Sequence, residues 1–176
     1  MKYYSLTISG IKRELPIVSL SPKVKIASFN LLGDTQIVEN IAQELLEKIK
    51  IFEFDYLVGP EVKVVPLLHE LSRLLKKEKY IICRKQIHGY MVNPIISRVK
   101  PGLVLDGNDA SLLNGKKVVV VDDVVSSGRT MKVLDNLMKL AQATIEAHVA
   151  VFKQGDSEDK ELNNLIHLGE LPLFTT

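Results

Sequence analysis

The chain has 176 residues, a length that fits one domain of ordinary size with a single sizeable core. Its composition is 46% hydrophobic and 25% charged, which excludes a disordered chain, and a formal charge of +2 gives no strong field for nucleic acid. There is no signal-peptide pattern at the N-terminus and no apolar run near the roughly 20 residues of a membrane helix. The one cysteine, Cys83, suits a reducing compartment. We therefore expect a cytoplasmic protein that binds neither nucleic acid nor membrane.

The first 30 residues are rich in β-branched and aromatic residues and are interrupted by glycine and proline, so they predict short strands and turns. A helix is predicted from Asp34, because apolar residues follow at positions 37, 41, 45 and 49. Further along, apolar segments that predict buried strands alternate with helical periodicity. The strands are expected at 56–59, 80–83, 117–121 and 146–152, and the helices at 64–75 and 131–141. This alternation predicts an α/β fold with a mostly parallel sheet between helices.

Residues 86–100 have mixed polarity without a clear period, and they contain Gly89 and Pro94. They predict a long loop, and loops of this length in compact domains are usually functional lids or disordered segments. Because no repeat and no linker is present, we expect 1–176 to form a single domain.

The most informative segment runs from Val118 to Thr130. Four valines predict a strand buried on both faces, and Asp122 and Asp123 follow at its carboxyl end. A loop of small and hydroxyl-bearing residues then leads directly into a helix. Open α/β sheets bind ligands at this edge, and a helix N-terminus with free amide groups attracts phosphate.

The two aspartates cannot serve that phosphate, because like charges repel. Their natural partners are hydroxyl groups or a metal, so the segment predicts a site for a ribose phosphate. An aspartate after a buried strand is often only a helix cap or a turn residue, but the flanking pattern argues against that interpretation. The segment lacks the glycine–lysine pattern of a Walker A loop.

Residues 118–130 resemble the PRPP-binding motif of type I phosphoribosyltransferases, where PRPP is 5-phosphoribosyl 1-pyrophosphate. Val58–Val64 resembles the pyrophosphate loop of the adenine enzymes, and Ile82–Lys85 resembles the strand end before their mobile catalytic loop. The resemblance thus extends along most of the chain and is closest to the adenine and other purine enzymes. It implies a parallel core sheet, a small hood from residues 1–30, a mobile loop at 86–100, Mg²⁺ dependence and a homodimer.

The same resemblance implies roles for individual residues. Asp122 and Asp123 would hold the ribose hydroxyls and act indirectly on Mg²⁺, which PRPP itself mainly holds. The 5′-phosphate would lie in the loop formed by Val125, Ser126, Ser127, Gly128, Arg129 and Thr130. The pyrophosphate would be bound by Glu61, Val62, Lys63, Arg84 and Lys85. The catalytic set would be Asp122, Asp123, Lys63 and Arg84.

The pyrophosphate loop of this family often contains a cis peptide, which we expect at Val62–Lys63. His88 and Tyr90 would belong to the lid. The segment 25–34 stands where adenine enzymes approach the base, so the candidates for base contacts are Ile26, Ala27 and Phe29.

The sequence also departs from the adenine enzymes, which carry a glutamate in the mobile loop. Residues 86–105 contain neither glutamate nor aspartate. We expect transfer of the phosphoribosyl group to a purine base, with adenine ahead of hypoxanthine, guanine or xanthine. Two alternatives stay open: a PRPP-binding regulatory protein without catalysis, and a transferase for a pyrimidine base such as orotate.

Overall fold

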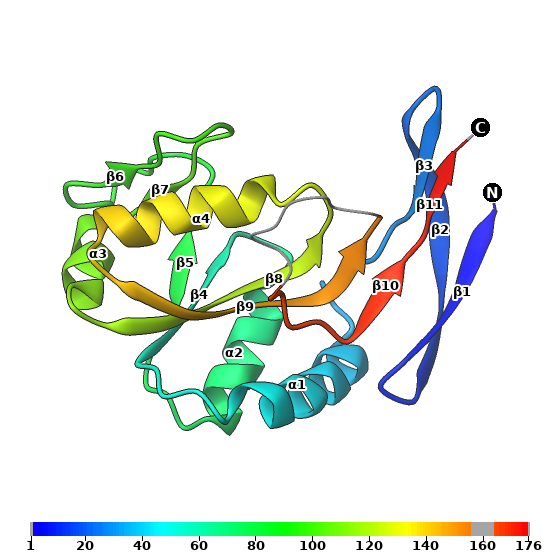
Figure 1. Cartoon of the computed structure of the whole chain (residues 1–176), viewed down its shortest axis with the longest axis horizontal. Helices are drawn as coiled ribbons and strands as arrows, with labels where there is room; N and C mark the ends of the chain where they lie inside the picture. Colours follow the sequence, from blue (N-terminus) through cyan, green and yellow to red (C-terminus); the bar gives the residue numbers. More distant parts are fainter. Residues whose placement is uncertain (1, 156–163, 176) are drawn as a thin grey trace.

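A five-stranded parallel sheet forms the centre of the computed structural model, which describes residues 2–155 and 164–175. The strand order is β10-β9-β8-β4-β5, and every neighbouring pair is parallel. The strands are β4 (Tyr56–Pro60), β5 (Ile81–Cys83), β8 (Lys117–Val125), β9 (Thr144–Gln154) and β10 (Gly169–Leu171). Helices α1 (Thr35–Ile49) and α2 (Val65–Leu74) cover one face, and α4 (Arg129–Leu140) covers the other (Figure 1). The predicted α/β fold is therefore confirmed.

The sequence places the start of α1 correctly. The Asp34 side chain accepts a hydrogen bond from the Ile37 amide at 3.2 Å and so caps the helix. Strand β8, in contrast, is longer than predicted. We expected it to end at Val121 with both aspartates just beyond its carboxyl end, but it continues to Val125 because its pairing with β9 continues opposite Ala150, Phe152 and Lys153. The two aspartates therefore lie on a strand paired along its length, not on a turn.

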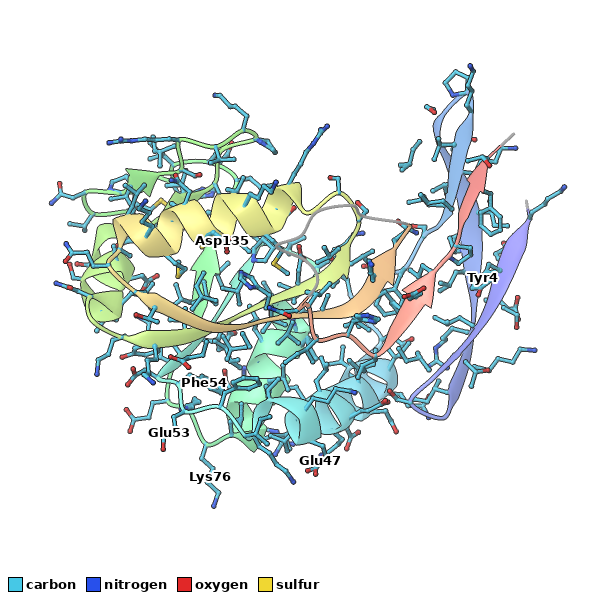
Figure 2. All side chains as sticks on the ribbon, viewed as in Figure 1. Tyr4, Glu47, Glu53, Phe54, Lys76 and Asp135 are labelled. Atoms are coloured by element: carbon cyan, nitrogen blue, oxygen red, sulfur yellow. The ribbon has the colours of Figure 1, made fainter. Side chains whose placement is uncertain are left out.

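A second sheet forms the hood, in the order β1-β2-β3-β11. Three strands come from the N-terminal region, as expected: β1 (Tyr3–Ile8), β2 (Ile11–Ser21) and β3 (Val24–Ala27). The fourth, β11 (Leu173–Thr175), was not predicted, and it pairs antiparallel with β3. Tyr4 packs edge-on against Phe174 at 6.1 Å between ring centroids, on the hood side of the molecule in Figure 2. The hood is thus built from both ends of the described chain.

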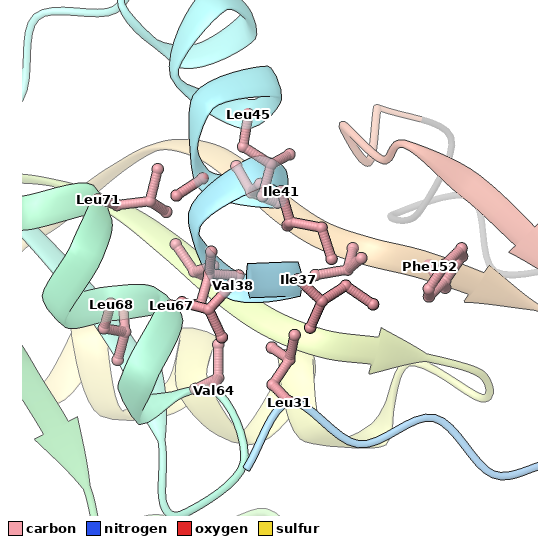
Figure 3. Close-up of a cluster of buried hydrophobic side chains, with 14 of the residues drawn as sticks. Leu31, Ile37, Val38, Ile41, Leu45, Val64, Leu67, Leu68, Leu71 and Phe152 are labelled. Carbon is pink, nitrogen blue, oxygen red and sulfur yellow. The ribbon is translucent and has the colours of Figure 1, made fainter. Parts of the chain in front are cut away.

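The alternating side chains of β8 divide the core into two clusters. Val119 and Val121 point toward α1 and α2, whereas Val118 and Val120 point toward α4. Figure 3 shows the first cluster, in which the buried faces of the two helices meet over one face of the sheet. Its labelled side chains are fully or almost fully buried: Leu31, Ile37, Val38, Ile41, Leu45, Val64, Leu67, Leu68, Leu71 and Phe152. This apolar support on both faces fixes the strand that carries Asp122 and Asp123.

Close packing between β4 and β8 depends on Gly59. A Cβ atom at this position would lie 2.6 Å from the Val121 carbonyl oxygen and 2.9 Å from Leu68 Cδ1. Any other side chain would therefore push against the backbone of the strand that carries the aspartates.

The segment after β5 contains regular structure that the sequence did not reveal. Strands β6 (Ile95–Ile96) and β7 (Val104–Leu105) form an antiparallel pair, and α3 (Gly107–Leu113) follows. Part of the segment 86–100, which we expected to be an irregular loop, is therefore a strand. No helix within residues 2–155 and 164–175 has the length and apolar character needed to cross a membrane.

Candidate active site

A cavity of about 590 Å³ opens at the carboxyl ends of β4 and β8. Side chains from the segment between β3 and α1, from the segment after β4 and from the end of β8 meet here. Its lining is formed by Asn30, Leu32, Pro60, Glu61, Val62, Lys63, Val64, Lys85, Pro101, Gly102, Leu103, Asp122, Asp123, Val124, Thr130 and Val133. The position agrees with the rule that open α/β sheets bind ligands outside the carboxyl ends of their strands.

Two adjacent acids form the floor of this cavity. Asp122 and Asp123 are 6% and 8% exposed. Burial, together with the neighbouring Asp123 charge, raises the pKa of Asp122 well above its ordinary value. The Asp123 Oδ2 atom is buried and has no hydrogen-bond partner among the described residues, although Lys63 Nζ lies 3.7 Å away. Buried acceptors of this kind are ready to bind hydroxyl groups or a cation.

The loop that we expected to bind phosphate surrounds a separate hollow of about 40 Å³. The residues that line it are Asp122, Val124, Val125, Ser126, Ser127, Gly128, Arg129, Thr130 and Met131. Gly128 adopts φ +71° at the N-cap of α4, a conformation that glycine adopts readily, and the first turn of α4 carries no acid. Val125 is buried in the core, so it can offer only its backbone. The free amides and the helix dipole therefore favour an anion here.

The segment after β4 brings one lysine into the cavity. Lys63 Nζ lies near Asp123 and also donates to the Phe29 carbonyl oxygen at 3.4 Å. A cis peptide is present, but it joins Glu61 and Val62, one residue before the Val62–Lys63 bond that we expected to be cis. The Lys63 ammonium is thus the cation of this segment that faces the acids of β8.

Arg84 lies outside the cavity lining, in a cluster with His88 and Tyr90, the two residues that we expected in a lid. Its Nε donates to Glu61 Oε2 at 2.5 Å and its Nη1 to the Tyr90 hydroxyl at 2.6 Å, while Nη2 lies 3.1 Å from His88 Nε2. The rings of His88 and Tyr90 are stacked, 5.4 Å apart. Lys85, in contrast, lines the cavity. The structure therefore brings Lys63 and Lys85 to the cavity and holds Arg84 beside it.

Glu61 acts on this cluster rather than on an anion. Its Oε1 accepts the backbone N–H of Lys85 at 2.7 Å, and its Oε2 accepts from Arg84. Burial raises the pKa of this carboxyl, but the bonds from Lys85 and Arg84 outweigh burial and hold the pKa below its usual range. An ionised carboxylate would repel pyrophosphate, so the geometry assigns Glu61 to holding its basic neighbours in place.

The three residues that we expected to contact the base lie outside the cavity lining. Ala27 is 1% exposed, and Phe29 is buried against Phe152, with ring centroids 4.7 Å apart. Ile26 is part of β3, inside the hood sheet, and is partly buried. The chain turns after β3, and the next positions, Asn30 and Leu32, line the cavity instead. In that turn the Leu32 amide donates to Asn30 Oδ1 at 3.2 Å, a local bond that asparagine often makes in turns.

A magnesium ion fits the acids of β8. Magnesium prefers oxygen ligands and is usually held by one or two carboxylates together with substrate phosphates. Asp122 and Asp123 supply such oxygens at the cavity, and Asp123 Oδ2 has no hydrogen-bond partner within the described chain. Among residues 2–155 and 164–175, no three His, Cys, Asp or Glu side chains are placed so that together they could hold a metal ion.

Taken together, the parallel sheet, the open start of α4 and the acids beside it define an α/β protein with a site suited to a sugar phosphate. Residues 32–166 match the family described as the phosphoribosyl transferase domain. This match spans more than half of the chain, which therefore belongs to the phosphoribosyltransferase family, with the type I fold.

Known relatives agree with this assignment. HGPRTase-like protein 3 of Haloterrigena turkmenica is 31% identical over 134 residues, which are 74% of this chain and 69% of the relative. Orotate phosphoribosyltransferase of Archaeoglobus fulgidus is 28% identical over 172 residues, which are 97% and 84% of the two chains. The solved structure of adenine phosphoribosyltransferase from Thermoanaerobacter pseudethanolicus has the same fold, with a TM-score of 0.70, 18% identity and coverage of 96% and 95%. The relatives are named for different bases, so they define phosphoribosyl transfer rather than the choice of base.

Proposed function

We propose that the chain transfers the 5-phosphoribosyl group of PRPP to a purine base, with adenine favoured, and releases pyrophosphate. One observation carries this proposal. Two buried aspartates at the end of β8 lie between an anion-binding hollow at the start of α4 and a larger cavity that holds two lysines. A ligand that satisfies all three regions has a phosphate at one end, a diol in the middle and a further anionic group, as PRPP has.

In this proposal, the loop 125–130 binds the 5′-phosphate through its amides and hydroxyls. Asp122 and Asp123 accept hydrogen bonds from the ribose hydroxyls and favour the positive charge that develops at C1′ as its bond to pyrophosphate breaks. A nitrogen of the base then bonds to C1′ and loses its proton. Magnesium, when bound with PRPP, neutralises charge on the pyrophosphate leaving group. Lys63 and Lys85 stabilise the same charge from the protein side.

The side of the cavity next to the hood is the place proposed for the base. Asn30 and Leu32 line the cavity there, and the Asn30 amide group keeps donors beyond the oxygen that accepts from Leu32. The segment with His88 and Tyr90 would close over the bound substrates and exclude water, which would otherwise hydrolyse PRPP.

We also propose a cytoplasmic homodimer. Exposed apolar side chains on one short segment support a contact with a second copy: Ile87, Tyr90, Val92 and Ile96.

A second candidate function is PRPP binding without transfer. It is favoured by the lack of any glutamate or aspartate in residues 86–105. The next carboxylate along the chain, Asp106, accepts from the Asn108 amide at 2.8 Å and from the Val92 amide at 3.2 Å, and so caps α3. A carboxylate used in this way is a poor general acid for a base in the cavity.

Pyrophosphate release separates the two candidates. The protein is incubated with PRPP and Mg²⁺, and adenine, hypoxanthine, guanine, xanthine, orotate and uracil are offered separately. Release with one purine, matched by its nucleotide on chromatography, is the expected result. Release with orotate alone would contradict the purine proposal. Binding of PRPP by calorimetry without release for any base would leave the second candidate as the function.

A further inference from the structure

One wall of the cavity is a short loop between β6 and β7. The Ser97 amide donates to the Leu103 carbonyl oxygen at 2.9 Å and closes this loop, and Leu103 is 8% exposed. Three of its residues line the cavity: Pro101, Gly102 and Leu103. We call residues 97–103 the wall loop. Because the wall loop lines the cavity, its position determines how much space a ligand has on that side.

A single side chain of α4 holds the wall loop by hydrogen bonds. Asn136 Oδ1 accepts the Arg98 backbone N–H at 2.8 Å and the Ser97 hydroxyl at 3.1 Å. Ser97 is 6% exposed, and its hydroxyl oxygen also accepts the Val99 amide at 3.2 Å. Two donors from consecutive residues thus converge on one amide oxygen, which leaves little freedom for the start of the loop.

We propose that Asn136 is a positioning residue for phosphoribosyl transfer, a role that rests on the function proposed above. Helix α4 begins at the phosphate-binding loop, and two of its residues, Thr130 and Val133, line the same cavity as the wall loop. By tying the wall loop to this helix, Asn136 sets the distance between one wall of the cavity and the anchor of the 5′-phosphate. Misplacing a group by about 1 Å can reduce turnover by about 100-fold even when the change is remote from the reacting atoms.

Three variants isolate this role. Asn136→Ala removes the acceptor of both hydrogen bonds, whereas Asn136→Asp keeps a side-chain oxygen in the same place and should restore them. Asp135→Ala is the matched control on the same helix, labelled in Figure 2. Asp135 hydrogen-bonds to His148 of β9 at 2.7 Å, and neither residue lines the cavity.

Trypsin reports the position of the wall loop without any need for activity. Arg98 is exposed, and the next basic residue, Lys100, precedes a proline and is resistant to trypsin. We expect cleavage after Arg98, followed by mass spectrometry, to be about tenfold faster in Asn136→Ala, because two hydrogen bonds to the start of the loop are lost; a tenfold change corresponds to about 1.4 kcal/mol. Asn136→Asp and Asp135→Ala should be cleaved at the wild-type rate.

Turnover completes the test. We expect kcat/KM to fall by about 10- to 100-fold in Asn136→Ala, to recover in Asn136→Asp and to stay within about twofold of wild type in Asp135→Ala. Equal cleavage rates in all proteins would overturn the anchoring role, and faster cleavage with unchanged kcat/KM would overturn the positioning role. If wild type releases no pyrophosphate with any base, the proposed function fails. In that case the PRPP dissociation constants of wild type and Asn136→Ala decide the inference, and equal constants would overturn it.

Discussion

Replacing Asp122 by asparagine should make the protein more stable and less active. Burial and the charge of Asp123 raise the pKa of Asp122 above its ordinary value of 3.8, so holding it ionised at neutral pH opposes folding. Asparagine removes this charge but keeps the local geometry. Its oxygen can still accept the Asp123 amide, which lies 2.8 Å from Asp122 Oδ1, and its NH₂ group can donate to the Asp123 carboxylate.

The size of the effect follows from the pKa. Each unit by which folding raises a carboxyl pKa removes about 1.4 kcal/mol of stability at pH values above both the folded and the unfolded pKa. For a chain of this size, 1 kcal/mol shifts the melting temperature by about 2–4 °C. Since Asp122 is only 6% exposed, solvent screens little of the charge, and a single unit alone predicts a rise of about 3–6 °C. Turnover should fall about 100-fold or more, because the ribose loses a charged partner.

The assay is thermal unfolding at several pH values, followed by pyrophosphate release. Because the folded-state pKa is raised, wild type gains stability as the pH falls through that pKa toward 3.8, and the advantage of the variant should shrink and disappear there. Glu53→Gln, at an exposed position, is the control and should change the melting temperature by less than about 1 °C. An Asp122→Asn protein that melts at or below the wild-type temperature at pH 7, or that turns over normally, would refute this reasoning.

Three further substitutions test other parts of the site. Gly128→Val forces a β-branched residue to φ +71°, which costs about 1–2 kcal/mol, and it should weaken PRPP binding by at least about tenfold in calorimetry; unchanged affinity would contradict the phosphate assignment. Gly59→Ala places a methyl group 2.6 Å from the Val121 carbonyl oxygen, which should reduce the free energy of unfolding by about 3 kcal/mol and the melting temperature by about 6–12 °C. A shift below about 1 °C would show that β4 and β8 can move apart at no cost in stability. Glu61→Gln should lower the free energy of unfolding by about 1.5–3 kcal/mol at pH 7, because it weakens the charged hydrogen bond with Arg84. Because the pKa of Glu61 is lowered, that stability is present above its ordinary value of 4.5 and lost as the pH falls through the folded pKa, so chemical denaturation should give equal stabilities for wild type and variant at low pH.

The order and type of the core elements could be predicted because apolar periodicity is a local signal. The cap at Asp34, the helices and the four strands expected in the sheet all follow from patterns within a few residues. Strands β6, β7, β10 and β11 and the short helix α3 were missed: the strands have only two or three residues, too few to establish a period, and the short β5 was found because Tyr80-Ile-Ile-Cys83 is a continuous apolar run. β8 was predicted too short, since aspartates usually end a strand and only its partner β9 keeps it extended.

The pattern of residues alone could predict the candidate site only where it lies in one continuous segment, whereas Lys63 and Lys85, which also line the cavity, were named through the family resemblance. Residues 122–130 carry their own pattern, and the structure brings them to two adjoining hollows. The contact of Glu61 with Arg84 could not be predicted, because the two residues are 23 positions apart and only the fold brings them together. For the same reason, no local signal marks Asn136, whose partners Ser97 and Arg98 lie in a distant segment. The residues expected to contact the base, at 26, 27 and 29, lie outside the cavity lining because the chain turns after Ala27 and buries Phe29, so that Asn30 and Leu32 line the cavity.

The pairing of β11 with β3 has a consequence for how the protein is made. Leu173 lies opposite Ile26, so one edge of the hood cannot be completed until a strand far along the chain from its partner has been synthesised. Strands β4 and β8, whose ends line the cavity, are synthesised much earlier and can pair first. A newly made chain would therefore acquire its phosphate site before its hood is complete. Deleting residues 173–175 should disturb the hood before it disturbs the aspartates.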